Sequence, residues 1–171
     1  MIERTLTIFK PDAVEKKAYG HMLQHLLDEG FVVRGLRVLH LTVEQARAFY
    51  AVHRERPFFA ELVAFMTSGP VVAACLERDN AVARLREVMG PTDSTKAPAD
   101  TVRGRFGTDI QRNAIHGSDS PETARREMGF FFPELDLVAV STGHSGTASE
   151  HEGGATPPTS DLQRPPRIRE R

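Results

Sequence analysis

Apolar residues recur at strand and helix spacings along the first 140 residues of the chain. In the segment 4–10, Leu6 and Ile8 alternate with Thr5, Thr7 and Phe9, which is the period of a β-strand, and Pro11 ends it. The apolar residues of the next segment fall on one helical face, and Gly30 favours a left-handed end to that helix. Further strands or short extended pieces are predicted at 31–41, 70–77, 113–117 and 135–140.

Start and stop signals place helices between these strands. Thr42 is a suitable N-cap, Pro57 suits a first helical position, and Ser120 is an N-cap followed directly by a proline. The segment 91–112 has no apolar period, so we expect a long loop with a functional role. The helices predicted from caps and apolar spacing are one after Val14 that carries Met22, Leu23, Leu26 and Leu27 and ends at Gly30, and others at 43–53, 57–69, 79–90 and 121–129.

The order of these elements predicts a compact α/β sandwich in which helices cover one face of a sheet. From Ser141 to Arg171 the composition changes to Ser, Thr, Gly, Pro and charged residues that offer little to bury. Such a segment cannot offset the entropy cost of ordering its backbone. We therefore expect one domain over 1–140 and a flexible tail over 141–171.

The overall composition argues against several classes of partner. The 171 residues are 40% hydrophobic, enough for one buried core, and carry a formal net charge of -1. This balance gives no sign of a nucleic-acid or membrane surface, and no segment resembles a membrane span or a secretion signal. The single cysteine, Cys75, suits a reducing compartment. We expect a cytoplasmic protein that binds neither membranes nor nucleic acids.

His116 is the main candidate for chemistry, because it stands shortly before the predicted helix that Ser120 caps. A neutral imidazole is a competent nucleophile near physiological pH, and a helix N-terminus offers N–H groups to a phosphate. Glu127 lies on the same helix, where side chains lean toward the N-terminus, so it can orient the ring. On these residues alone, a strand-end histidine with a turn at Gly117 is the more ordinary interpretation, and the attacking nitrogen is undefined.

Cationic side chains elsewhere in the chain offer contacts for phosphate. Lys10 ends the first strand beside a rigid proline, although an ordinary lysine on an edge strand fits equally well. Arg86 lies near a helix end with Thr92 beyond it, where a solvated helix face is the plainer interpretation. Arg103 lies in the aperiodic loop, as a fork for phosphate or as surface charge. The sequence has no glycine-rich phosphate loop, so a nucleotide would have to be held by scattered cations.

Aromatic residues offer a surface on which a base could stack. Phe58 can be such a platform or part of the core, and the core is the plainer interpretation. Tyr50 and His53 share a helix face by their spacing, so they can line a cleft or pack together. None of the histidines is paired with cysteine or an acid at a spacing typical of zinc sites.

Several segments, in their order along the chain, resemble the nucleoside diphosphate kinase family. They read ERTLTIFKPDAV, FYAVHRERPFF, FMTSGPVV, LREVMGPTD, VRGRF and RNAIHGSDSPETARREMGFFF, and the resemblance spans Glu3 to Val140. It implies a ferredoxin-like βαββαβ fold with an antiparallel sheet and helices packed on it. It also implies an enzyme that moves the γ-phosphoryl group of a nucleoside triphosphate such as ATP to a nucleoside diphosphate such as GDP, through a phosphohistidine in a ping-pong cycle.

The resemblance assigns roles to residues by their positions in these segments. It makes His116 the phosphorylated residue, supported by Glu127 and Ser118. The residues it places on the nucleotide phosphates are Lys10, Arg86, Thr92 and Arg103. It places Lys10 and Asn113 at the ribose, and Phe58 and Ile110 at the base. It places Tyr50 and His53 at the wall of the pocket.

The resemblance also implies a cofactor and an assembly. Mg²⁺ would arrive with the nucleotide and be held by phosphates and water, without a cage of protein carboxylates. A homo-oligomer, tetramer or hexamer, is implied as well. The segment TDSTKAPADT departs from the family in a loop that helps build trimer contacts, with Ser94 and Asp100 where proline and glycine are usual. The polar tail is also longer than the usual family ending.

Two other functions fit parts of the sequence. A regulatory nucleotide-binding protein on the same scaffold would turn over little, but the complete set of His, Lys, Arg, Thr and Asn argues against a decayed enzyme. An RNA-binding domain would present aromatic residues on strand faces, and the segments 4–10 and 70–77 offer no such exposed pair. A phosphoryl-transfer enzyme is therefore our expectation from the sequence.

Overall fold

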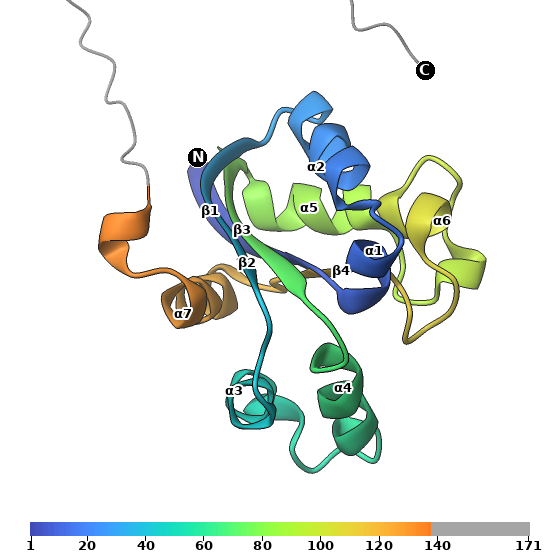
Figure 1. Ribbon diagram of the computed structural model, residues 1–171. Helices are drawn as coiled ribbons and strands as arrows, with labels where there is room; N and C mark the ends of the chain where they lie inside the picture. The colour runs from blue at the N-terminus through green and yellow to red at the C-terminus, as the bar shows by residue number, and fades with distance from the viewer. Residues whose placement is uncertain (138–171) are drawn as a thin grey trace, which may run out of the picture. The chain divides into compact units, whose positions relative to one another are not determined.

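The computed structural model describes residues 1–137, which contain a four-stranded antiparallel sheet in the order β2-β3-β1-β4 (Figure 1). The strands are β1 (Ile2–Phe9), β2 (Val32–Leu39), β3 (Val71–Asp79) and β4 (Ile115–Gly117). Where a strand is predicted at 135–140, Glu134–Asp136 instead form a short 3₁₀ helix, η3. The rest of that segment and the predicted tail from 141 to 171 lie outside the described residues.

Helices follow the caps that the sequence contains. Thr42 caps its helix with the two reciprocal bonds of a capping box, and the Ser120 hydroxyl accepts a bond from the N–H of Thr123. No helix within residues 1–137 is long and apolar enough to cross a bilayer. The helices are α1 (Pro11–Glu15), α2 (Tyr19–Asp28), α3 (Val43–Phe49), η1 (Ala51–His53), α4 (Phe59–Met66), α5 (Ala81–Met89), η2 (Ser94–Lys96), α6 (Val102–Phe106) and α7 (Pro121–Phe131).

The topology confirms the fold class. β1, α2, β2, β3, α5 and β4 follow the βαββαβ order of the ferredoxin-like fold, and α3 and α4 are inserted between β2 and β3. In Figure 1 this inserted pair lies beyond one end of the sheet, next to the start of β3. The long central strands β1 and β3 pair along their whole length, so β1 lies inside the sheet with β4 on its other side.

Helices cover both faces of the sheet, so the prediction of one covered face is wrong. On one face Phe9 and Leu76 pack with Leu26 of α2 and with α5. On the other, Leu6 and Ile8 pack with residues of α3, α4 and α7. The alternation in β1 predicts a half-buried strand, yet the polar Thr5 and Thr7 between its apolar residues are also fully buried. A threonine fits an apolar layer because its hydroxyl is small and its methyl group packs.

The segment 91–112, which the sequence predicts to be a loop, contains η2 and the single turn of α6. Thr101 caps α6, since its side chain accepts a bond from the N–H of Gly104. A helix of five residues is too short to show an apolar period, which is why the pattern misses it. The predicted helix 43–53 is likewise shorter: α3 ends at Phe49, and 51–53 form the 3₁₀ helix η1.

Candidate active site

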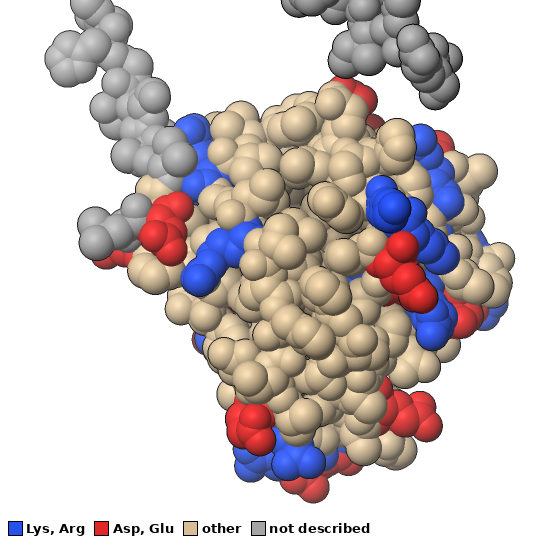
Figure 2. All heavy atoms as spheres, viewed as in Figure 1, with Lys and Arg blue, Asp and Glu red and all other residues tan. Residues whose placement is uncertain are grey.

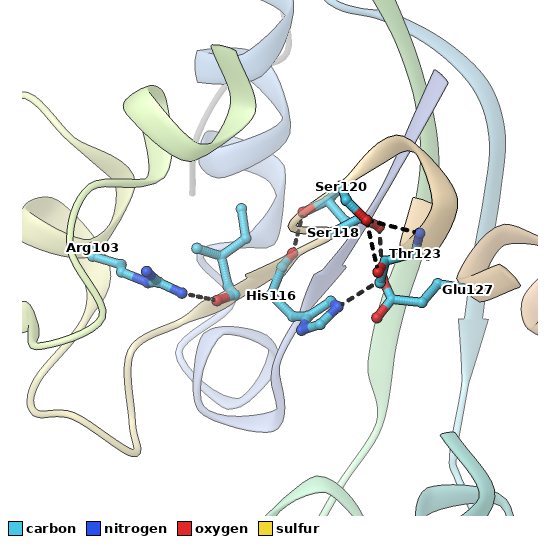
Figure 3. Close-up of polar contacts among 8 residues, drawn as sticks. Arg103, His116, Ser118, Ser120, Thr123 and Glu127 are labelled. Atoms are coloured by element: carbon cyan, nitrogen blue, oxygen red, sulfur yellow. Dashed lines mark hydrogen bonds and ion pairs between the residues drawn. The ribbon is translucent and has the colours of Figure 1, made fainter. Parts of the chain in front are cut away.

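His116 lies on β4, directly opposite Ile8 of the central strand β1. The Thr7 hydroxyl donates a 2.8 Å bond to the His116 carbonyl, which anchors the backbone at this point. The imidazole side chain is 20% exposed, and its Nε2 lies 3.0 Å from Oε2 of Glu127 (Figure 3). The ring is therefore held at one nitrogen and is still reachable from solvent.

Glu127 is the partner that the sequence predicts for His116. Its Oε2 also accepts a 2.6 Å bond from the Ser118 hydroxyl, so one carboxylate oxygen holds both groups (Figure 3). Burial by itself would raise the pKa of Glu127, but the bonds from His116 and Ser118 and the charge of His116 together lower it. An ionised carboxylate can only accept hydrogen bonds, so Nε2 carries the ring proton. Nδ1 then keeps a free lone pair, and within residues 1–137 it has no hydrogen-bond partner.

The imidazole contacts α7 in the second turn, at Glu127, and not at the N-terminus. The N–H groups of the first turn therefore lie away from this contact, and that of Thr123 already bonds the Ser120 hydroxyl. The sequence-based idea that the N-terminus of this helix binds phosphate gains no support from this geometry.

Aromatic rings enclose one side of His116. The ring centroid of Phe49 lies 5.6 Å from that of His116, and the centroid of Tyr50 lies 6.1 Å away. Tyr50 is buried, and burial followed by the charge of Glu127 raises the pKa of its hydroxyl far above the usual value. His53 stacks on Tyr50, and the half-exposed Phe58 contacts His53 in turn. Tyr50 and His53 thus form a wall that leads from His116 to Phe58.

Lys10 follows the end of β1, and its Nζ donates a 2.7 Å bond to Oδ1 of Asn113. The interpretation of an ordinary edge-strand lysine is wrong, because β1 is a central strand and Lys10 is only 8% exposed. Burial, and then the charge of Arg103, lower the pKa of Lys10 to about 8. An anion close to Lys10 would stabilise the protonated, charged form of its ammonium group.

Asn113 joins three segments that are far apart in the sequence. Its Oδ1 binds Lys10, and its Nδ2 donates 3.0 Å bonds to the carbonyls of Thr92 and Ile110. Ile110 is 65% exposed. The side chain of Gln111 bonds the carbonyl of Glu61, which brings this loop beside α4, the helix that begins just after Phe58.

Arg103 reaches from α6 to the strand that carries His116. Its Nη1 donates a 2.9 Å bond to the Gly90 carbonyl. Its Nη2 donates a 3.1 Å bond to the Ile115 carbonyl, which is the one dashed line from Arg103 in Figure 3. Burial, and then the charge of Arg86, lower the pKa of Arg103 to about 10. Arg103 in turn lowers the pKa of Lys10, so Arg103 is electrostatically coupled to two other cations, Arg86 and Lys10. Such a cluster favours a ligand with several negative charges.

The structure adds residues that sequence reasoning misses. Asp12 is buried, and its Oδ2 accepts a 3.0 Å bond from the N–H of Ala114. Thr7 and Phe49 anchor and pack His116. The only signal for Asp12 is its place two residues after Lys10, and that spacing alone does not show what it contacts.

Related proteins share both the sequence and the length of this domain. Residues 3–137 match the family model described as nucleoside diphosphate kinase. The nucleoside diphosphate kinase of Aquifex aeolicus is 54% identical over 140 residues, which cover 80% of this chain and 99% of that protein. That of Anaeromyxobacter dehalogenans is 53% identical over 138 residues, which cover 81% of this chain and 94% of that protein.

Solved structures agree with the sequence relatives. A crystal structure of the Aquifex aeolicus nucleoside diphosphate kinase matches with a TM-score of 0.79 at 53% identity, covering 81% of this chain and 100% of that one. The enzyme of Halobacterium salinarum, solved in complex with CDP, matches with a TM-score of 0.79 at 37% identity, covering 82% and 94%.

The fold, the site and these relatives define a phosphotransferase that acts on nucleotides. The chain belongs to the nucleoside diphosphate kinase family, as the resemblance of its segments predicts. It transfers the γ-phosphoryl group of a nucleoside triphosphate to a nucleoside diphosphate. The alternative of a regulatory protein with little turnover is not favoured.

Proposed function

We propose that Nδ1 of His116 is the nucleophile that carries the phosphoryl group between nucleotides. The observation that supports this most is the bond between Nε2 and the ionised Glu127, which leaves the lone pair on Nδ1. Nδ1 attacks the γ-phosphorus in line, a P–N bond forms, and the bond to the bridging oxygen breaks with its electrons going to the departing diphosphate. The acceptor diphosphate reverses these steps.

Glu127 stabilises the phosphorylated ring in this proposal. While Nε2 keeps its proton, the imidazole gains positive charge as the P–N bond forms. The carboxylate 3.0 Å from Nε2 offsets that charge, and Ser118 fixes the carboxylate. His116 and Glu127 therefore act as a nucleophile and its orienting partner.

The cations around Arg103 bind the phosphates. The charge of Arg103 acts on Lys10 and the charge of Arg86 acts on Arg103, which supports the convergence of these cations on one polyphosphate. Phosphoryl transfer requires mainly positioning and charge stabilisation, so these groups supply much of the rate enhancement. The residues assigned to the phosphates are Lys10, Arg86, Thr92 and Arg103. Lys10 and Asn113 are assigned to the ribose, and Phe58 and Ile110 to the base.

Mg²⁺ is the proposed cofactor, bound through the nucleotide. Within residues 1–137, no cluster of three or more His, Cys, Asp or Glu side chains is arranged to hold a metal ion. Phosphate oxygens and water would therefore have to supply its ligands, which suits the way Mg²⁺ keeps much of its hydration. When bound, it would neutralise part of the charge on the β- and γ-phosphates.

A second copy of the chain is the proposed partner along β2. β2 is an edge strand with Leu36 and Val38 exposed by 49% and 68%, and in the described residues its outer edge has no strand partner. Figure 2 shows a mostly uncharged surface in this part of the view. Antiparallel pairing of two identical edges about a two-fold axis would satisfy their backbone groups and form the basic unit of a tetramer or hexamer.

Replacing Val38 with lysine tests this interface. A charge on the edge strand opposes pairing, so Val38→Lys should reduce the molar mass measured by light scattering. Val52→Lys, at a valine that is 64% exposed on η1 and away from β2, serves as the control. An unchanged mass for Val38→Lys would contradict the interface.

Two expectations from the sequence stay proposals. One is a catalytic domain over 1–140 with a separate tail over 141–171. The other is a cytoplasmic location, for which the support is the free, buried thiol of Cys75.

Phosphorus NMR on the phosphorylated protein tests the choice of nitrogen. After incubation with ATP and removal of nucleotide, an alkaline digest should contain phosphohistidine substituted at Nδ1. A product substituted at Nε2, or phosphate on another residue type, would contradict the proposed chemistry.

A further inference from the structure

Asp12 is a buried carboxylate that no step of the proposed reaction uses. Asp12 is 1% exposed and lies in the first turn of α1. Oδ2 accepts a 3.0 Å bond from the N–H of Ala114, and Oδ1 is buried without a hydrogen-bond partner in the part of the chain that the structure describes. Burying a carboxylate that is only partly hydrogen-bonded is costly, so the question is what its bond to Ala114 contributes.

The bond from Asp12 holds an unusual backbone. Ala114 has φ 66, a left-handed conformation that is unfavourable for a residue with a Cβ. Its N–H is bonded to Asp12 and its carbonyl to the N–H of Lys10, at 2.9 Å. Both peptide hydrogen-bonding groups of Ala114 are therefore fixed by the Lys10–Asp12 segment.

Ala114 lies between the two halves of the active site. Asn113 before it holds the Lys10 ammonium, and His116 follows two residues later on β4. A change of backbone conformation at Ala114 would rotate the Lys10–Asn113 pair relative to the imidazole.

We propose that Asp12 is a positioning residue, which clamps the left-handed Ala114 and so sets the placement of the Lys10–Asn113 pair relative to His116. The inference rests on the proposed roles of His116 and Lys10. Its charge has a second consequence at the same place. Among the charged groups around Lys10, Arg103 on α6 disfavours the protonated ammonium. Asp12 on α1 and Asp109 in the loop after α6 favour it.

Two variants of Asp12 separate these effects. Asp12→Asn keeps an oxygen acceptor for the Ala114 N–H but removes the negative charge. Asp12→Ala removes both. Asp136→Asn and Asp136→Ala, at an exposed aspartate on η3, are the matched controls. For each protein we would measure urea unfolding, the single-turnover rate of phosphohistidine formation from ATP, and ADP affinity between about pH 7 and 10, where lysines with lowered pKa titrate.

Asp12→Ala should form phosphohistidine at least about tenfold more slowly than the wild type, since a small displacement of reacting groups has a large effect on rate. Asp12→Asn should recover most of that rate. However, its ADP affinity should decline at a pH lower by about half a unit or more, because Lys10 loses a favourable charge. Both control variants should behave as the wild type.

Three results would overturn the inference. One is a wild-type rate in Asp12→Ala. Another is an alkaline decline of ADP affinity in Asp12→Asn at the wild-type pH. The third is a rate loss in Asp12→Asn as large as that in Asp12→Ala. If Asp12→Ala fails to fold, the Asp12→Asn profile still decides. If the wild type itself forms no phosphohistidine, the proposed function fails, and that outcome is distinct from these three.

Discussion

At the scale of single residues, one carboxylate oxygen determines which nitrogen of the imidazole can react. Oε2 of Glu127 binds Nε2 of His116 and the Ser118 hydroxyl, so the ring proton and the lone pair are assigned to opposite sides of the ring. The sequence predicts the His116–Glu127 pair from helix geometry. It does not predict the nitrogen, because a ring flip leaves the sequence pattern unchanged.

Variants of Glu127 test this assignment. Glu127→Gln keeps an acceptor for Nε2–H but loses the negative charge, so single-turnover phosphorylation should slow by about 10- to 100-fold. Glu127→Ala, which also loses the orientation of the ring, should be slower still. KM for ATP should change little, because within residues 1–137 the Glu127 carboxylate hydrogen-bonds His116 and Ser118 and no cation of the proposed phosphate site. Glu122→Gln, exposed in the first turn of α7, is the control. A wild-type rate in Glu127→Gln would show that the carboxylate charge plays no part.

Lys10 makes nucleotide binding depend on pH in the alkaline range. Its pKa is lowered to about 8, mainly by burial. Below that pH the ammonium is charged and attracts phosphate, and above it the charge is lost, so the ADP dissociation constant should rise as pH increases through about 8. Bound phosphate favours the protonated form of Lys10, so in the ADP complex the pKa of Lys10 lies higher than in the free protein. Calorimetric titration of ADP should show this rise in the wild type and a nearly flat profile in Lys10→Met. A flat profile in the wild type would contradict the role of Lys10.

At the scale of elements, the short helix α6 delivers Arg103 to β4. Gly104 in α6 is packed so tightly that an added Cβ would lie 2.0 Å from the Pro98 carbonyl oxygen. The apolar pattern predicts the long helices and central strands because many residues repeat the same period. It misses α6, which has a single turn and is held by contacts to Pro98 and Gly90 rather than by its own periodicity.

Alanine at two glycines tests the role of α6. Gly104→Ala should lower the free energy of unfolding by about 1–3 kcal/mol, since backbone must shift to admit the methyl group. It should also slow turnover by displacing Arg103. Gly129→Ala, in α7 where a Cβ meets nothing within 4 Å, should instead raise stability by about 0.5–1 kcal/mol and leave turnover unchanged. Urea unfolding and steady-state kinetics would detect both, and equal stability of the two variants would contradict the packing described.

At the scale of the whole molecule, the proposed site draws on segments that are distant in sequence. Lys10 comes from the end of β1, Arg86 from α5, Arg103 from α6 and Asn113 from the approach to β4. Considered singly in the sequence, Lys10, Arg86 and Arg103 each fit an ordinary structural or surface role, and Asn113 gives no signal. Only the resemblance to the family joins them at the sequence level, because convergence depends on the order β2-β3-β1-β4.

The same scale explains why one covered face is predicted and two are found. The alternation in β1 suggests that Thr5 and Thr7 form an exposed face, but both are fully buried, and Phe9 further along the same face packs with α2 and α5. The Thr7 hydroxyl donates a hydrogen bond to the His116 carbonyl, which links residues 109 positions apart. Local patterns cannot predict such a bond, because it exists only once β4 pairs with β1.

The most direct test of the account is a label-transfer experiment with His116→Ala. The wild type, mixed with γ-radiolabelled ATP and freed of nucleotide, should carry acid-labile label and pass it to added GDP. The variant should unfold at nearly the wild-type urea concentration yet carry no label. If His116→Ala acquires the label and transfers it to GDP, His116 is not the nucleophile and the proposed mechanism is wrong.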